Sequence, residues 1–556
     1  MRPSLTLLAA VSSLIIAGPA IAETREAPIA PPRLVVAISV DQLAADLFAQ
    51  YRQHFTAGLG RLLTGAVFPS ALQSHAATET CPGHSTLLTG ARPARTGIIA
   101  NTWFVPGIAR ADKRVYCSED ETDPASTSRD SVVSARQLKV PTLGERLKAA
   151  NRKSLNVAVS AKDRAVMMMG GHAIDAGYWW KGGAFATLAG RPLSPAARAA
   201  NRASAEVIAA GAHELPLPAW CAARDEAVPV GDGMIGTGRF ALPAGQADAF
   251  RVSPRMDAAT VDLAVALVDE MKLGADAAPD VLSVSLSATD YIGHAAGHEG
   301  AEMCIQMAQL DASIGRLLDA LDARGLDYVV ALSADHGGVD AVERLGRQGY
   351  PEAARIDGSL TADALAAAVT AATGITVADG PLVYNAFPGG DYWLSAALAP
   401  QDKARAVAAL AATARANPQV AAVFTAAEIA AAPAPAGSPQ DWSLLDRAKA
   451  SFDPQRSGDV VVLLKRGVSP IRKPGPGYSA THGSPWDYDR RVPLLFWRKG
   501  LAGFEQPAPV ETVDIAPTLA ALLELDVPAG AFDGRCLDID GGAGDTCAPP
   551  PRKTAR

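Results

Sequence analysis

The sequence lacks a second long apolar run, a surplus of basic residues and any closely spaced cysteine pair. After the first 22 residues, no stretch supplies the roughly 20 consecutive apolar residues of a membrane-spanning helix. The formal net charge is −7, with no basic stripe, which argues against nucleic acid as a standing partner. No C-x-x-C pair occurs, which argues against a zinc site built from thiolates. An anionic substrate must therefore be held by local positive charge.

The N-terminal segment has the pattern of a signal peptide. Arg2 precedes a mostly apolar run at 5–16, and a small-x-small sequence follows at 20–22. The apolar run is short for a membrane span. We expect cleavage after Ala22 and export of a soluble protein to the periplasm or the extracellular medium.

Export makes disulfides possible for the six cysteines. Six cysteines can pair in fifteen ways, and the sequence does not choose among them. We favour one short closure, because two of the cysteines lie in a Gly- and Asp-rich loop near the C-terminus. That pair is Cys536 with Cys547, and the other cysteines are Cys81, Cys117, Cys221 and Cys304.

The pattern of apolar runs predicts the fold class. Short runs rich in β-branched residues alternate with helical patterns such as 305–321. These runs are typical of buried parallel strands, and the prediction is an α/β fold with an open, mainly parallel sheet and helices on both faces. The runs lie at 34–40, 155–159, 281–286, 328–332, 460–464 and 492–496.

Two stretches interrupt this alternation. The segment at 181–252 is rich in Ala, Gly and Pro with weak periodicity, and the segment at about 360–440 is Ala-rich, has helical patterns at 362–372 and 402–416, and ends in a Pro/Ala linker. We interpret 23–550 as one catalytic domain in which these two stretches are insertions.

Carboxylate and imidazole side chains follow the predicted strands. In an open α/β sheet the ligand site lies at the carboxyl ends of the strands. Three carboxylates and three imidazoles there match the oxygen and nitrogen donors that two zinc ions need, with positions left open for substrate. The six candidates are Asp41, Asp290, His294, Asp335, His336 and His482.

The spacing of these residues supports the interpretation. Asp290 and His294 stand four residues apart, so one helical turn places both on the same face, whereas adjacent Asp335 and His336 suit an irregular turn. Taken alone, Asp41 fits a helix N-cap or a turn equally well. The coincidence of six such residues, in a chain with only nine histidines, favours metal binding.

Other residues compete for these roles. His298 lies eight residues beyond Asp290, so we favour His294 over it as the ligand. We expect His84 to brace its loop by a hydrogen bond. Thr80 is placed to open a helix, where backbone N–H groups and the helix dipole favour a phosphate, although a plain N-cap is the alternative. Cys81 is a weaker nucleophile candidate, because no His/Asn partner pattern accompanies it.

A basic pair follows the predicted strand at 155–159. Lys162 and Arg164 could clamp a phosphate, since arginine offers a planar fork and lysine a point charge, or they could lie in a solvated loop.

The motifs together resemble those of bacterial zinc alkaline phosphatases with a threonine nucleophile, in the alkaline phosphatase superfamily. The resemblance covers residues 34 to 530, and the motifs are specific as a series, although each is weak alone. They are D-Q-L at 41–43, T-E-T-C-P-G-H-S at 78–85, T-D-Y-I-G-H at 289–294, S-A-D-H-G-G at 333–338 and T-H-G-S at 481–484.

The resemblance implies an exported phosphatase that hydrolyses small-molecule phosphate monoesters through a phosphothreonine on Thr80. One zinc ion would be held by Asp290, His294 and His482. The second would be held by Asp41, Asp335 and His336, with Thr80 bridging from it. Asn101, Lys162 and Arg164 would bind the phosphate.

Three other functions are weighed against this one. A nucleotide pyrophosphatase/phosphodiesterase shares the metals and the threonine, but the pair Lys162 and Arg164 suits a dianionic monoester better. A cofactor-type mutase on the same fold would be cytoplasmic, which the signal peptide opposes. A non-catalytic binding protein does not explain six ligands together with a hydroxyl nucleophile.

Overall fold

The protein is described by a computed structural model that covers residues 30–475 and 477–548. The expected signal peptide at 1–22 lies outside these residues. Within them, no helix has both the length and the apolar character needed to cross a bilayer.

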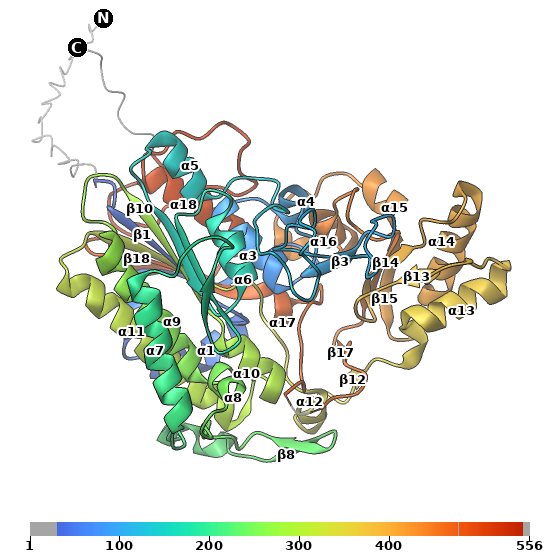
Figure 1. The fold of residues 1–556 in the computed structure, drawn as a ribbon, viewed down its shortest axis with the longest axis horizontal. Helices are drawn as coiled ribbons and strands as arrows, with labels where there is room; N and C mark the ends of the chain where they lie inside the picture. The colour runs from blue at the N-terminus through green and yellow to red at the C-terminus, as the bar shows by residue number, and fades with distance from the viewer. Residues whose placement is uncertain (1–29, 476, 549–556) are drawn as a thin grey trace, which may run out of the picture.

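A nine-stranded sheet forms the centre of the molecule (Figure 1). β1 (Leu34–Val40) is buried along its whole length and pairs in parallel with β10 (Asp280–Leu286) and β11 (Tyr328–Ser333). β5 (Asn156–Ser160) and β6 (Ala176–Lys181) continue the sheet in the same direction. The full order is β19 (Phe504–Glu505), β2 (Ala66–Leu72), β18 (Arg491–Arg498), β11, β1, β10, β5, β6 and β7 (Ala184–Thr187).

The sheet is mixed but mostly parallel. β18 runs antiparallel to both of its neighbours, β11 and β2, and β7 runs antiparallel to β6. The prediction of a mainly parallel sheet is therefore confirmed, and the run at 492–496 is corrected from a parallel to an antiparallel strand. Strand direction was not predictable there, because a buried strand has the same apolar pattern in either direction.

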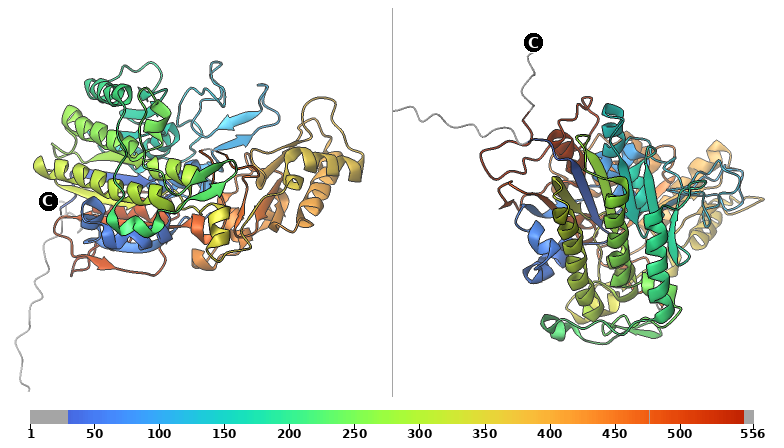
Figure 2. Two further views of the ribbon diagram at one scale, coloured as in Figure 1. Left: turned by 90° about the horizontal axis from the view of Figure 1, so that it is seen from below. Right: turned by 60° about the vertical axis from the view of Figure 1, so that its left-hand side comes forward.

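Helices cover both faces of the sheet (Figure 2). One layer contains α7 (Pro195–Ala210), α9 (Pro254–Met271) and α11 (Gly300–Ala323), which pack against one another. Another contains α3 (Thr80–Thr89), α5 (Leu143–Ala150), α6 (Asp163–Gly170) and α18 (Ile515–Leu522). The helical pattern at 305–321 is confirmed by α11. The strands of the nine-stranded sheet and these helices contribute to a single large apolar core.

A second, four-stranded sheet forms a subdomain at one end of the molecule (Figure 1). Its order is β13 (Val383–Tyr384), β14 (Gly390–Leu394), β16 (Val460–Leu464) and β15 (Val420–Thr425), and α13 (Ala362–Thr373) and α14 (Pro400–Arg415) belong to it. The prediction that 460–464 is a parallel strand of the main sheet is wrong. Alternate β16 side chains enter two small apolar clusters on its two faces, so both faces are buried without the main sheet.

Three disulfides link the six cysteines. Cys536 pairs with Cys547, which confirms the predicted closure. The other two pairs join residues far apart in the chain, namely Cys81 with Cys117 and Cys221 with Cys304.

Candidate active site

The site lies at the carboxyl ends of the three central strands. Ser39 of β1 is in register with Ser285 of β10 and with Ser333 of β11, so the residues that follow these strands arrive at one edge. Asp41 directly follows β1, Asp335 lies two residues after the end of β11, and both are fully buried. The strand pairing therefore gathers residues that are nearly 300 positions apart in the chain.

A first group of donors comes from one helix and one loop. α10 (Ala288–Ala296) places Asp290 and His294 on one face, and the Nε2 of His294 lies 3.3 Å from Asp290 Oδ1. His482 approaches from the loop before β18, with its Nε2 3.4 Å from the same oxygen. One donor atom from each of the three lies within 4.8 Å of the others, a spacing that fits a shared metal ion.

A second group surrounds Asp41. The Nε2 of His336 lies 3.6 Å from Asp41 Oδ1 and 3.4 Å from Asp335 Oδ2. The ring of His336 stacks on the ring of His482 at a centroid distance of 3.6 Å, which joins the two groups. Three-residue clusters suited to a metal form here from Asp41 with Asp290 and His336, and from Asp41 with His84 and Asp335.

Backbone carbonyls orient the three candidate histidine ligands. The Nδ1 of His294 lies 2.9 Å from Ala480 O, that of His336 lies 2.8 Å from Gly337 O, and that of His482 lies 2.8 Å from Thr78 O. Because a carbonyl oxygen can only accept a hydrogen bond, each Nδ1 is the donor, and in the neutral ring each Nε2 keeps a lone pair beside the carboxylates. Burial also lowers the pKa of His336 and His482, which favours the neutral ring that binds metal.

His84 braces the start of α3, as predicted. Its Nε2 lies 3.0 Å from Ser285 Oγ, and its Nδ1 lies 2.9 Å from both Thr80 O and Asp335 Oδ2. Both ring nitrogens are thus engaged by the protein. His298, the other competitor, bonds Gln42 Oε1 through Nε2 at 2.9 Å and does not contact Asp290 directly.

The charge balance of this region fits bound cations. Burial, together with Asp290 and Asp335, raises the pKa of Asp41 well above its usual value. In this region, both carboxylate oxygens of Asp41 and the Nε2 of His336 are buried without a hydrogen-bond partner among the described residues. A buried hydrogen-bond acceptor without a partner destabilises the fold. Carboxylate oxygens beside neutral imidazoles are suitable ligands for a divalent metal ion.

One protein cation already approaches these carboxylates. The Lys162 ammonium contacts Asp290 Oδ2, and it lies 2.6 Å from Asp41 Oδ2 without hydrogen-bond geometry. Lys162 is almost fully buried at the residue before α6. The structure therefore places this predicted phosphate-binding residue between the two donor groups.

Thr80 begins α3, as the sequence predicts, and is buried. His84 Nδ1, which lies 2.9 Å from both Thr80 O and Asp335 Oδ2, links it to the second donor group. Arg164 extends from the first turn of α6, and its Nη2 lies 3.5 Å from Thr80 Oγ1. Asn101 Oδ1 accepts a hydrogen bond of 2.8 Å from the backbone N–H of Cys81, which orients the Asn101 amide at the start of the same helix. The hydroxyl and these polar groups thus converge on one point.

Several residues that support the site were not predicted. Gln42 donates from Nε2 to Asp290 Oδ1 at 3.1 Å, and its backbone N–H donates to Asp335 Oδ1 at 3.1 Å. Its φ of 66° lies in the left-handed region that non-glycine residues seldom adopt. Tyr116 bonds Asp163 at 2.7 Å and lies 3.5 Å from Arg164 Nη1. The sequence signal for Gln42 was its place in the D-Q-L motif, directly after the candidate ligand Asp41.

Comparison with known proteins identifies the family. The family model described as type I phosphodiesterase / nucleotide pyrophosphatase matches residues 35–485. The chain belongs to this family. It is 50% identical to the alkaline phosphatase PhoK of Sphingomonas sp, over 93% of each chain. It is 48% identical to the alkaline phosphatase PhoD of Zymomonas mobilis, over 94% of this chain and 91% of that one.

A solved structure supports the same assignment. The crystal structure of the alkaline phosphatase PafA matches with a TM-score of 0.79 at 26% identity, over 93% of this chain and 100% of that one. The resemblance to the alkaline phosphatase superfamily is therefore confirmed, and this member of the type I phosphodiesterase / nucleotide pyrophosphatase family is a phosphatase of the alkaline phosphatase type.

Proposed function

We propose that the protein is an exported phosphomonoesterase that uses Thr80 as its nucleophile at a site for two zinc ions. The observation that supports this most strongly is the position of the Thr80 hydroxyl at a helix N-terminus, beside Arg164, in a residue that His84 links to Asp335 of the second donor group. The first test is the hydrolysis of 4-nitrophenyl phosphate compared with bis(4-nitrophenyl) phosphate. A preference for the diester would contradict the proposal.

The ligand assignment follows from the two donor groups. Asp290, His294 and His482 would hold one zinc ion, and Asp41, Asp335 and His336 would hold the other, close to Thr80. When bound, the two ions would lower the pKa of the threonine hydroxyl and neutralise charge on the leaving oxygen.

The residues of the chain then carry the phosphoryl transfer. The Thr80 hydroxyl loses its proton and its oxygen attacks phosphorus in line. The P–O bond to the alcohol breaks, the leaving oxygen takes up a proton, and a phosphothreonine forms. The guanidinium of Arg164, the Lys162 ammonium and the Asn101 amide steady the non-bridging oxygens. Water then attacks the phosphothreonine, which releases inorganic phosphate and restores the Thr80 hydroxyl.

The family description also makes a phosphodiesterase a candidate. A diester carries one fewer charge and one fewer free oxygen than a monoester, so it makes less use of two cations. Lys162 and Arg164 both point to the nucleophile and donor groups, which favours a dianionic substrate.

Removal of both cations tests this preference. Each charge-assisted hydrogen bond contributes roughly 1.5–3 kcal/mol, so monoester hydrolysis should fall by about one to two orders of magnitude for each residue. Diester hydrolysis should fall less. We expect the double variant Lys162→Ala/Arg164→Ala to lower the ratio of kcat/KM for the monoester to kcat/KM for the diester, while both metals stay bound. An equal loss of the two activities would mean that the pair does not select monoesters.

We also propose the domain limits and the export route. Residues 23–550 would form the mature catalytic domain, with insertions at about 181–252 and 360–440, after removal of residues 1–22. Three disulfides in one chain support an oxidising destination such as the periplasm or the extracellular medium.

The disulfide beside the nucleophile should matter for activity. Cys81 follows Thr80 and Cys117 follows Tyr116, so this bond ties the start of α3 to the segment that contacts Arg164. We expect Cys81→Ala/Cys117→Ala to lower the free energy of unfolding by about 4 kcal/mol, from loop entropy. We also expect it to lower kcat/KM about tenfold, since small displacements of catalytic groups are costly.

A matched variant separates the two effects. Cys536→Ala/Cys547→Ala opens a shorter loop, with a separation of 11 residues against 36. It should lose about 3 kcal/mol of stability and keep its kcat/KM. Urea unfolding and steady-state kinetics below the unfolding transition provide both measurements. Full activity in the Cys81 and Cys117 variant would show that this bond is only structural.

A further inference from the structure

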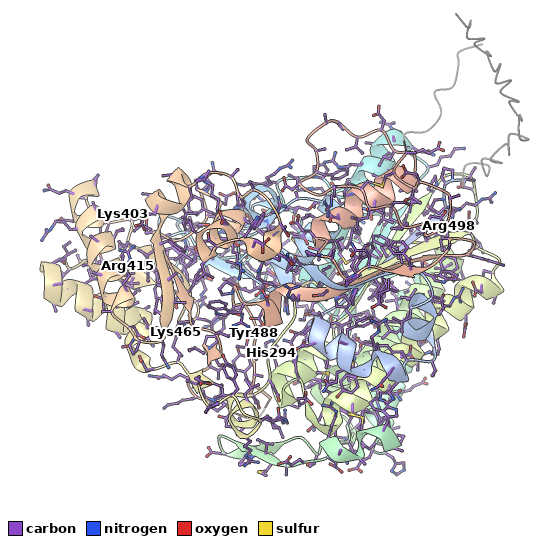
Figure 3. All side chains as sticks on the ribbon, turned by 180° about the vertical axis from the view of Figure 1, so that it is seen from behind. His294, Lys403, Arg415, Lys465, Tyr488 and Arg498 are labelled. Atoms are coloured by element: carbon purple, nitrogen blue, oxygen red, sulfur yellow. A yellow bond between two sulfur atoms is a disulfide. The ribbon has the colours of Figure 1, made fainter. Side chains whose placement is uncertain are left out.

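A cavity of about 330 Å³ opens beside the first donor group. His294 and His482 lie at one side of it, and residues of the four-stranded subdomain form the opposite side. Figure 3 shows His294 on the part of the main body that faces the subdomain carrying Lys403 and Arg415. The leaving alcohol of a substrate attacked by Thr80 would enter this cavity, because the cavity is lined by Glu79, the residue before Thr80, together with His294 and His482.

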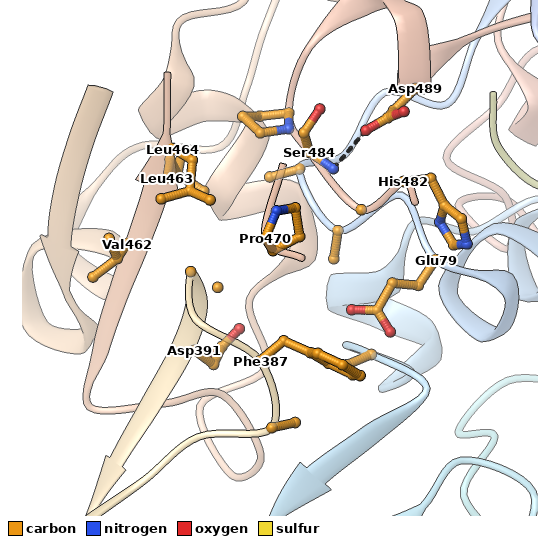
Figure 4. Close-up of a pocket in the computed structure, with 18 of the residues that line it drawn as sticks. Glu79, Phe387, Asp391, Val462, Leu463, Leu464, Pro470, His482, Ser484 and Asp489 are labelled. Atoms are coloured by element: carbon orange, nitrogen blue, oxygen red, sulfur yellow. Dashed lines mark hydrogen bonds between the residues drawn. The ribbon is translucent and has the colours of Figure 1, made fainter. Parts of the chain in front are cut away.

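The lining combines negative charge with aromatic rings. Among the described residues that line the cavity, the carboxylates are Glu79, Asp391 and Asp489, and none of the lining residues is lysine or arginine. Aromatic rings come from Phe387, Trp393 and Tyr478, and apolar walls come from β16. In the view of Figure 4, the ring of Phe387 lies between the carboxylates of Asp391 and Glu79.

Two of these side chains are available to a ligand. Asp391, at the start of β14, accepts a 2.6 Å hydrogen bond from the Gly458 N–H through Oδ1, which leaves Oδ2 for a ligand. Phe387 is 61% exposed, which is unusual for so large an apolar side chain. Burial raises the pKa of Asp391 to about 6, so this carboxylate is charged at alkaline pH although it is poorly solvated.

We propose that this cavity is a leaving-group subsite for phosphate monoesters whose alcohol carries an ammonium group. An ammonium would pair with Asp391 and lie against the ring of Phe387, which attracts cations through its π face. A neutral aromatic alcohol would fill the apolar walls but leave the Asp391 charge without a partner. This inference rests on the proposed function and names its substrate class.

The reaction at this subsite is the hydrolysis already described. For a choline ester, the P–O bond to choline breaks, the choline oxygen takes a proton that derives from water, and the water oxygen ends in inorganic phosphate. The ammonium group keeps its charge throughout, so its contacts serve binding and orientation.

The test compares two esters that differ in one atom. Phosphocholine carries a trimethylammonium group, and 3,3-dimethylbutyl phosphate carries the neutral tert-butyl group of the same shape. We expect Asp391→Asn to lower the phosphocholine/dimethylbutyl ratio of kcat/KM about tenfold relative to the wild type, and Phe387→Leu to lower it about threefold. Taking each variant's ratio relative to the wild type cancels the intrinsic reactivity difference between the esters.

The controls separate this inference from the proposed function. In Asp391→Asn the amide oxygen can still accept the bond from the Gly458 N–H, so the loop stays anchored while the charge is removed. Asp379→Asn removes an exposed carboxylate of the same subdomain as a matched control, and it should leave the ratio unchanged. Ratios that stay at the wild-type value in both test variants would overturn the subsite. If instead the wild type fails to hydrolyse 4-nitrophenyl phosphate, the proposed function itself fails.

Discussion

Replacing Thr80 by alanine is expected to lower kcat for 4-nitrophenyl phosphate by on the order of 10⁴-fold. The physical reason is that alanine removes the oxygen that receives the phosphoryl group, while Arg164 and both donor groups stay in place. Metal content should therefore persist, because Asp41, Asp335 and His336 supply the second site without the hydroxyl. Turnover kinetics and metal analysis of the same preparation check both expectations.

The conservative variant is the control. Thr80→Ser keeps a hydroxyl at the first position of α3 and should retain substantial activity. Acid quench during turnover, followed by mass spectrometry, should find phosphate on residue 80 of the wild type. Phosphate trapped on another residue would refute the nucleophile assignment, even if Thr80→Ala proved inactive.

Loss of a metal ligand should have an effect of comparable size. A metal that polarises a phosphoryl oxygen contributes several kcal/mol, which at about 1.36 kcal/mol for each tenfold corresponds to roughly 10³-fold in rate. We expect Asp335→Ala and His482→Ala each to lose at least this much activity, together with part of the metal. The purified wild type should contain about two zinc ions per chain, lose activity to a chelator and regain it with zinc.

The matched control for these variants is His172→Gln. His172 is an exposed histidine that bonds Glu145 and lies outside the donor groups, so its replacement should change neither metal content nor turnover. Full activity with a single bound metal would contradict the two-ion site. Full activity in Asp335→Ala or His482→Ala would show that the residue is not a ligand.

Much of the site was predictable because its geometry follows from strand ends. β1 has the bounds predicted from its apolar run, and β10 and β11 differ by one residue. Parallel pairing of adjacent strands then brings their following residues together, whatever their distance in sequence. The turn of α10 likewise places Asp290 and His294 on one face, as their spacing indicated.

The remainder depended on contacts that no local pattern encodes. The run at 460–464 would have the same apolar pattern in either sheet, so the pattern does not say which sheet it joins. Its packing within the subdomain places it there. The cavity beside His482 combines residues from the main body with Phe387 and Asp391 of the subdomain, so it exists only in the assembled fold. The contact of Lys162 with Asp290 likewise joins two different strand ends.

The position of β18 in the sheet determines when this enzyme can begin to work. β18 comes late in the chain, yet it lies between β11 and β2, and both of its edges are paired. Until the ribosome has released the chain up to residue 498, β18 is missing, and β2 cannot be joined to the central strands. The chain also lacks His482 of the candidate site until residue 482 has been synthesised. The main sheet and the candidate site therefore cannot assemble until residues 482–498 are free to fold.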